Sequence, residues 1–295
     1  MSYCILPVQG EELFSLARSF VLPHEKYCCS LMQKIIGHER SLYLISRAEA
    51  QPRLQDIAGV FCFTDGELLL PCLPFRGHQL DAALSAFFAQ REVFCISGEK
   101  HSVRTIMRVL RARGGQQIKE EKKHFFMEFR AAADGQPPLE KRASGAAGDC
   151  TLVRCAAADA NGLMPLQLSY KTEEVLPPGV PVNPASERLE LDRALRTQTV
   201  FALRRPDGSF AAKAQTNAVC AGHVQIGGVF TRTSCRGHGY ASFLVHALAE
   251  NIVRQGKSAV LFVNRRNTAA VRAYRNAGFS RAGTYLIVYY EDASF

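Results

Sequence analysis

The sequence predicts an α/β (α+β) fold in two domains. Its 295 residues are too many for one typical domain and fit two. Residues 131–149 have no apolar periodicity and are rich in Ala, Gly and Pro, as a linker would be. On both sides short apolar strand patterns alternate with helix patterns, and strands followed by crossover helices imply a mixed sheet with helices on its faces. We therefore expect domains at 1–130 and 150–295.

The second half is predicted to alternate strands and helices as follows. Strand patterns lie at 152–155, 200–204, 211–216, 224–231, 259–263 and 285–290, and helix patterns at 158–175, 187–196, 240–255 and 267–277. Pro177-Pro178-Gly179 ends the first helix, and Pro206-Asp207-Gly208 is a hairpin turn. The strand at 259–263 is entirely apolar, so we expect it to be buried. Gly278 is placed to end the last helix.

The first half carries a fainter copy of this order. Arg76-Gly77-His78 precedes a helix pattern at 80–90, as Arg236-Gly237-His238 precedes the helix at 240–255. A buried strand at 93–96 then leads into a helix that ends near Gly114-Gly115, and a strand pattern follows at 125–129. We interpret this as an internal duplication; the alternative is chance matching of short apolar strands.

Composition excludes several classes of protein. The net charge is +9, but Lys and Arg are spread along the chain without a basic stripe interleaved with aromatic residues, so we do not expect a nucleic-acid partner. The ten cysteines are scattered without metal-ligand spacing, which predicts reduced thiols and no metal site. Neither a signal peptide nor an apolar run of about 18 residues is present, so we expect a cytoplasmic protein with no membrane partner.

The most informative segment is Cys235-Arg236-Gly237-His238-Gly239-Tyr240-Ala241, between a strand pattern and a helix pattern. A helix N-terminus has unpaired N–H groups and a partial positive charge, so it attracts phosphate. Gly239 has no side chain to block a phosphate, Ala241 is small, and Arg236 adds a cation. The segment is therefore a candidate anion site.

Three blocks of the second half resemble the GNAT N-acetyltransferase superfamily. Arg236-x-x-Gly239-x-Ala241 is similar to its phosphate-binding signature. Upstream, Gly227-Gly228-Val229-Phe230-Thr231 is similar to the family's splayed fourth strand. Downstream, Asn267, Tyr274 and Gly278-Phe279 are similar to the family's second signature, an Asn, a Tyr and a Gly-Phe at these intervals. The resemblance, which points to a poorly characterised bacterial branch, implies tandem GNAT-like folds, each a mixed, mostly antiparallel splayed sheet flanked by helices.

The resemblance implies an acetyl-CoA-dependent N-acetyltransferase in which a primary amine attacks the thioester directly in a ternary complex. The Val229 N–H would be the oxyanion donor. Tyr274 would be the general acid for the leaving thiolate; the alternative is a core tyrosine. Asn267 would bind the cofactor's amides, cap its own helix, or do both. The implied cofactor-binding residues are Val229, Phe230, Thr231, Arg236, Gly237, His238, Gly239, Tyr240, Ala241 and Asn267.

The general base is open at this stage. The strand at 224–231 contains no carboxylate, where some family members carry Glu. Glu173 or Glu174 could reach the substrate, or could simply be a solvated helix end. His223, His238 and ordered water are further possibilities.

The first half departs from the pattern. Gln79 replaces the residue equivalent to Gly239, and Asp81 replaces Ala241, so a side chain obstructs the phosphate and a carboxylate repels it. The positions equivalent to Asn267 and Tyr274 hold Lys100 and Met107 on one alignment, or Val103 and Leu110 on a neighbouring one. We therefore expect this half to keep the fold without binding coenzyme A.

Two other functions compete with the enzyme. The first is a non-catalytic acyl-CoA-binding or regulatory module, and the second is a nucleic-acid-associated protein. The sequence leaves the amine acceptor unidentified. The acyl-chain length is also open, and the protein could be a monomer or a homodimer.

Overall fold

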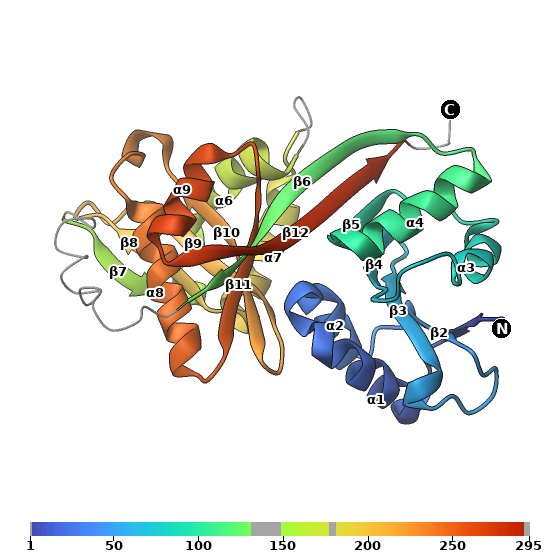
Figure 1. Cartoon of the computed structure of the whole chain (residues 1–295). Helices are drawn as coiled ribbons and strands as arrows, with labels where there is room; N and C mark the ends of the chain where they lie inside the picture. The colour runs from blue at the N-terminus through green and yellow to red at the C-terminus, as the bar shows by residue number, and fades with distance from the viewer. Residues whose placement is uncertain (1, 131–148, 177–180, 292–295) are drawn as a thin grey trace. The chain divides into compact units, whose positions relative to one another are not determined.

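The computed structural model describes residues 2–130, 149–176 and 181–291 (Figure 1). They form two compact units: unit 1 comprises Met1–Phe126 with Gly283–Phe295, and unit 2 comprises Met127–Ala282. The predicted linker lies outside the described residues except for Asp149, and so does the predicted turn at Pro177-Pro178-Gly179.

Unit 1 has a mixed sheet in the order β1-β2-β3-β4-β5-β12. The pairs β1–β2, β2–β3, β3–β4 and β5–β12 are antiparallel, whereas β4–β5 is parallel. The strands are β1 (Cys4–Pro7), β2 (Leu42–Ser46), β3 (Ile57–Phe63), β4 (Leu68–Cys72), β5 (Cys95–Glu99) and the last part of β12 (Phe279–Tyr290).

The helices of unit 1 are amphipathic and bury their apolar faces. They are α1 (Gly10–Val21), α2 (Cys29–Ile36), α3 (Asp81–Phe88) and α4 (Lys100–Arg113), with shorter helical turns at Leu22–Tyr27 and Leu54–Asp56. Phe61 of β3 contacts Phe87 and Phe88 of α3, with ring centroids 5.1 and 6.4 Å away. These rings join buried residues of α4 and β12 in one core, so the C-terminal strand belongs to this core.

Unit 2 has a mixed sheet in the order β6-β11-β10-β9-β8-β7. The pairs β7–β8, β8–β9 and β9–β10 are antiparallel, and β10–β11 is parallel. The strands are the last part of β6 (Ile118–Phe129), β7 (Thr151–Arg154), β8 (Val200–Arg204), β9 (Phe210–Val219), β10 (His223–Thr231) and β11 (Ser258–Asn264). All the strands predicted for the second half are therefore present, and the last is longer than predicted.

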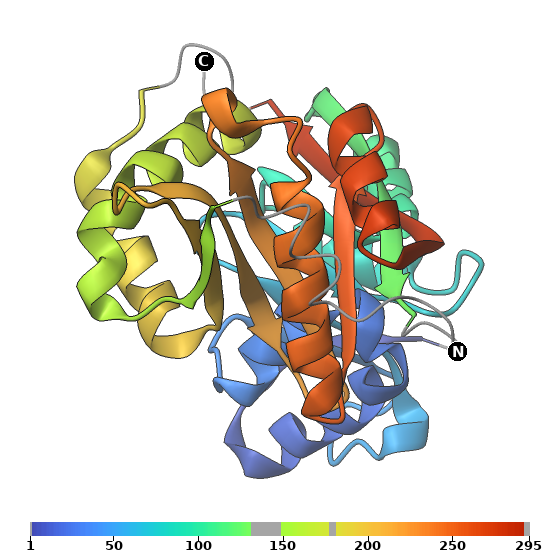
Figure 2. The same cartoon turned by 90° about the vertical axis from the view of Figure 1, so that its left-hand side faces the viewer.

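Helices cover the sheet of unit 2, and Figure 2 shows α8 running along its strands. The helices are α6 (Ala160–Tyr170), α7 (Pro184–Thr197), α8 (Tyr240–Arg254) and α9 (Thr268–Asn276), with short turns at Ala157–Asp159 and Thr233–Cys235. The helix predicted at 158–175 continues past α6 as one π-helical turn, Lys171–Val175. A core of α6 and α7 residues packs on Phe210 and Phe230.

The long strands β6 and β12 are each divided between the two units. Residues 127–129, at the end of β6, belong to unit 2, where β6 lies beside β11. The end of β12 belongs to unit 1 and pairs with β5 from Tyr285↔Glu99 to Tyr289↔Cys95. The unit boundaries fall inside β6 and β12. Strand patterning shows which residues are extended but not which strand they pair with, and the domains expected at 1–130 and 150–295 stay a prediction.

Two observations concern membrane-spanning helices and the state of the cysteines. In the described ranges no helix is both long enough and apolar enough to cross a bilayer. The ten cysteines are all free thiols.

Candidate functional site

The parallel pair β10–β11 is hydrogen-bonded over only a short stretch. The register covers His223↔Ser258, Val224↔Ala259 and Gln225↔Val260. Beyond these pairs β10 runs on to Thr231 and β11 to Asn264 without being paired to each other. Backbone groups that face such a split lack a ladder partner and can bind a ligand.

A β-bulge lies on β10 where the strands separate. Gly227 is opposite Gln215 and Phe230 is opposite Lys213, so Gly228 and Val229 together face one residue of β9. Gly228 has φ +56°, and a Cβ there would lie 2.8 Å from Cγ of Gln215, so the position needs glycine. A bulge takes its extra residue out of the ladder and re-aims the backbone. The Val229 N–H is therefore suited to bind a ligand oxygen.

The segment after β10 forms the predicted strand, turn and helix start. Gly237 has φ +84°, and Gly239 has φ +77° and is the N-cap of α8. No side chain caps this helix, so its first N–H groups are not taken by a neighbouring side chain. His238 Nδ1 lies 2.9 Å from the Arg236 carbonyl oxygen, and its ring stacks on Tyr240. The turn is therefore shaped to bind an anion.

Arg236 is held at the rim of this turn. Its Nη2 donates to Glu173 Oε2 at 2.6 Å and its Nε donates to the Thr231 carbonyl at 3.1 Å. The guanidinium also lies over the Phe230 ring, 5.5 Å from the centroid. The Phe230 side chain is buried with α6 and α7, so only its backbone is available to a ligand. Glu173, a candidate base, is thus paired with the candidate phosphate-binding cation.

Asn267 has one of the two roles that the sequence left open: it caps its own helix. Its Oδ1 accepts from the Ala270 N–H at 3.0 Å and so caps α9. Its Nδ2 lies 3.3 and 3.4 Å from the two carboxylate oxygens of Glu174, the second candidate base. The cap leaves this amide nitrogen to bind a ligand group when Glu174 moves away.

Tyr274 lies on α9 and is half-buried. Burial raises its pKa well above the usual phenol value, and the nearby Tyr170 and Glu174 raise it further. The backbone of Gly228 is hydrogen-bonded to the Tyr170 hydroxyl, which links this second phenol to the bulge. Sequence reasoning missed Tyr170, which counted only as one apolar position of a helix. Its place beside Tyr274 depends on packing between distant elements.

The corresponding turn of unit 1 already contains an anion. The Asp81 carboxylate, at the start of α3, accepts from Arg108 at 2.7 and 3.1 Å and lies 2.8 Å from His78 Nδ1. Burial alone would raise the pKa of Asp81, but the hydrogen bonds from Arg108 and His78 outweigh it and hold the pKa below its usual value. A carboxylate therefore sits where unit 2 leaves room for a phosphate.

The helix N-caps suggest a third alignment of the halves. The cap of α9 is Asn267, and the cap of α4 is Glu99, whose side chain accepts from the N–H groups of residues 101 and 102. Aligning the caps puts Ile106 opposite Tyr274, instead of Met107 or Leu110. The pairs Lys100 with Met107 and Val103 with Leu110 are thus displaced by one and four residues. Unit 1 still has neither Asn nor Tyr at these positions.

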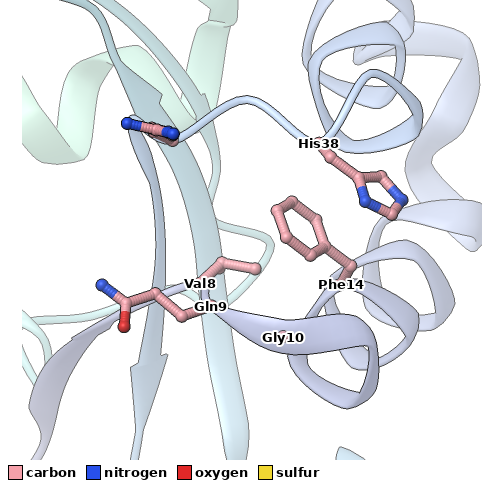
Figure 3. A pocket seen from close by; sticks show the side chains of 6 residues that line it. Val8, Gln9, Gly10, Phe14 and His38 are labelled. Carbon is pink, nitrogen blue, oxygen red and sulfur yellow. The ribbon is translucent and has the colours of Figure 1, made fainter.

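Unit 1 also contains a pocket of about 420 Å³ at the start of α1 (Figure 3). The rings of Phe14 and His38 stack there with centroids 4.3 Å apart. The pocket is lined by Val8, Gln9, Gly10, Phe14, His38 and Arg40, none of which is a predicted site residue. Within the described ranges, no group of three or more His, Cys, Asp or Glu side chains is arranged to hold a metal ion.

Comparison with known proteins bears on the fold. Residues 210–288 match the family described as FR47-like protein. The fold is similar to that of a GNAT-family acetyltransferase from Colwellia psychrerythraea, with a TM-score of 0.56, 12% identity and coverage of 98% of this chain and 99% of that one. The chain therefore has a GNAT-like fold.

Two more solved structures share this GNAT-like fold. A GCN5-related N-acetyltransferase from Sphaerobacter thermophilus has a TM-score of 0.62, 16% identity and coverage of 99% of this chain and 96% of that one. A tandem GNAT protein from the clavulanic acid biosynthesis pathway has a TM-score of 0.59, 11% identity and coverage of 100% and 99%. No protein of curated function matches the chain in sequence. The predicted resemblance and fold class are confirmed.

Proposed function

We propose that this GNAT-fold protein is an acetyl-CoA-dependent N-acetyltransferase whose site lies in unit 2. One observation carries the proposal: the split between β10 and β11 opens at the Gly228-Val229 bulge, directly upstream of the uncapped α8 N-terminus. A backbone edge beside a phosphate-binding turn suits a long ligand that has both amide and pyrophosphate groups.

Acetyl-CoA would use each part of this surface. The N–H groups from Gly237 to Ala241 and the Arg236 guanidinium would bind the pyrophosphate. The unpaired edge of β10 from Val229 to Thr231 would bind the amides of the pantetheine arm, together with Asn267 Nδ2. The net charge of +9 favours such an anionic ligand.

The chemistry is a direct acyl transfer. The neutral amine attacks the thioester carbon, a C–N bond forms, and the carbonyl oxygen becomes an oxyanion stabilised by the Val229 N–H. The C–S bond then breaks, and Tyr274 donates a proton to the leaving thiolate. Its raised pKa keeps the phenol protonated at neutral pH. The attacking nitrogen loses one proton, which replaces the proton given up by Tyr274, so the products are an acetylated amine and free coenzyme A.

An ammonium acceptor must first lose a proton. Glu173 is paired with Arg236, whereas Glu174 lies close enough to Tyr274 to raise the pKa of that phenol. Glu174 is therefore the better base of the two carboxylates, with ordered water as the alternative route.

The first test is calorimetric binding of acetyl-CoA, followed by turnover with a panel of primary amines. Released coenzyme A is measured by chromatography, because the chain's own ten thiols would react with a thiol dye. Tyr274→Phe should bind acetyl-CoA normally but lose turnover by about tenfold or more. Tyr289→Phe, which removes a phenol hydroxyl from unit 1, is the matched control and should keep normal turnover.

Three outcomes of this test separate the rival functions. Binding without turnover of any amine supports a non-catalytic acyl-CoA-binding module. Strong, salt-sensitive RNA binding in place of acetyl-CoA binding supports the nucleic-acid function. Absence of acetyl-CoA binding contradicts the proposal.

A further inference from the structure

Lys213 is a fully buried lysine in the middle of the unit 2 sheet. It lies on β9, with 0% of its surface exposed. In the strand register it pairs with Ala202 on one side and Phe230 on the other, both apolar and buried. A buried charge is costly unless it is paired, so a lysine at this position needs an explanation.

The ammonium has two partners, and neither is a carboxylate. Its Nζ donates to Gln215 Oε1 at 3.2 Å and lies 5.3 Å from the centroid of the Tyr170 ring. In the part of the chain that the structure describes, Lys213 forms no ion pair. Its charge is therefore not held in an ion pair, although the Glu187 carboxylate is near enough to raise its pKa.

Both partners of Lys213 also touch the bulge. Gln215 Oε1 is 3.1 Å from the point that a Cβ on Gly228 would occupy, and the Tyr170 hydroxyl is hydrogen-bonded by the backbone of Gly228. Lys213 and Gln215 lie two residues apart on β9, on the two sides of the residue that faces Gly228 and Val229. The lysine, its two partners and the bulge are thus one connected cluster.

We propose that Lys213 is a positioning residue for acyl transfer: it holds Gln215 and Tyr170 against the bulge and places a positive charge behind the Val229 N–H. This inference rests on the proposed function. A fixed charge in a site that excludes water stabilises a developing oxyanion more than a solvated charge does. In the attack step, electron density moves from the amine to the thioester oxygen, towards that charge.

Titration of Lys213 would switch this effect off. Burial lowers its pKa to about 8, and the negative charge of Glu187 opposes the shift. The groups that face it are Tyr170 from α6, Glu187 from α7 and Cys155 after β7. Glu187 is itself engaged by Lys171 at 3.0 Å and by Gln167 at 2.8 Å. A rise in pH through about 8 should therefore remove the charge behind Val229.

The test uses acetyl-CoA labelled with ¹³C at the carbonyl carbon and needs no acceptor. Isotope-edited infrared spectroscopy reports how strongly the protein polarises the bound thioester carbonyl. The wild-type protein should shift the carbonyl stretch to lower frequency, and Lys213→Met should lose most of that shift while binding acetyl-CoA within about threefold of wild type. Lys257→Met, which removes a lysine bonded to the Cys220 carbonyl, should keep the shift.

The pH dependence gives a readout that a purely structural role would not change. In the wild type the carbonyl shift should fade with a midpoint near pH 8, whereas in Lys213→Met it should be small and flat. Lys213→Arg, which keeps the charge at every pH, should keep the shift across the transition. Should Lys213→Met fail to fold, the wild-type titration decides.

Each outcome is decisive. If the carbonyl stretching frequency changes neither in Lys213→Met nor with pH, the proposed role of Lys213 is wrong. The acetyltransferase proposal is not affected by that result. If the wild-type protein does not bind acetyl-CoA, the proposed function and this inference fall together.

Discussion

The Glu173 carboxylate lies 2.6 Å from Nη2 of Arg236, 63 residues further along the chain. The next residue on the same π-helical turn, Glu174, accepts a hydrogen bond from the Asn267 side chain. Two residues assigned to cofactor binding are therefore engaged by two adjacent carboxylates. Under the proposed function, an incoming pyrophosphate would replace Glu173 as the partner of Arg236.

Glu173→Gln should tighten coenzyme A binding, because it removes this competing anion. Both side chains are half-exposed, and exposed ion pairs are worth about 0–1 kcal/mol, so we expect a two- to fivefold lower Kd, roughly. Isothermal titration calorimetry measures it. Asp207→Asn, which removes the exposed pair between Asp207 and Arg205, should leave the Kd unchanged. Equal or weaker binding by Glu173→Gln would contradict the competition.

Gly239→Ala should weaken coenzyme A binding by about tenfold or more, because the new methyl group meets the phosphates. Gly208→Ala in the β8–β9 hairpin is the matched control, since its φ of +82° is close to the +77° of Gly239. Each substitution should cost about 1–2 kcal/mol of stability from left-handed strain. Chemical denaturation and calorimetry separate the two effects, and equal loss of binding in both variants would rule out a phosphate role for the turn.

The pH profile of turnover should show no alkaline loss due to Tyr274. Burial raises its pKa above the usual value, so the phenol stays protonated through neutral and mildly alkaline pH. If Lys213 has the role inferred above, an alkaline loss should instead appear with a midpoint near pH 8. Profiles of kcat measured with the best amine, for the wild type and Tyr274→Phe, check this. An alkaline limb present only when Tyr274 is present would reverse the assignment.

Asp81→Asn should destabilise unit 1 near neutral pH but not in acid. The pKa of Asp81 is lowered in the folded state, so its ionised form contributes stability above the unfolded pKa, near 3.8. That contribution is lost as the pH falls through the folded pKa. The difference between wild-type and variant free energies of unfolding should therefore be present at about pH 7 and should shrink as the pH falls below 3.8 towards the folded pKa. Coenzyme A affinity should not change.

Leu286→Ala should destabilise unit 1, although residue 286 lies close to the C-terminus. The side chain is 1% exposed in the core that includes α3 and α4, and such a truncation costs about 2–5 kcal/mol. Hydrogen exchange should show lost protection in β5 and α4. Leu248→Ala, at a fully buried position of α8, should instead lower protection in unit 2. If both variants lost protection only in unit 2, the assignment of Leu286 on β12 to the core of unit 1 would be contradicted.

Much of the fold could be predicted because it is encoded locally. Apolar periodicity marks each strand and helix of unit 2, and the left-handed positions at Gly237, Gly239 and Gly278 hold glycine, which adopts them most readily. The phosphate turn needs only a strand end, two such glycines and a helix start within a few residues. A short window of sequence therefore suffices to predict it.

The division of β6 and β12 between the two units could not be predicted from local sequence patterns. Both strands show the expected apolar pattern, but the pattern is the same whichever sheet receives them. Pairing depends on register and on contacts between residues far apart in the sequence, such as Tyr285 with Glu99. The division of the chain into compact units therefore follows from tertiary structure.

The sequence by itself determined the class of fold, the anion-binding turn and the loss of that turn's small residues in the first half, because each depends on neighbouring side chains and backbone dihedrals. The tertiary structure decided which groups meet at the site. It brought Glu173 to Arg236, Tyr170 to Tyr274 and the buried Lys213 to the bulge. These contacts join elements far apart in the chain, and only packing places their side chains within interaction distance.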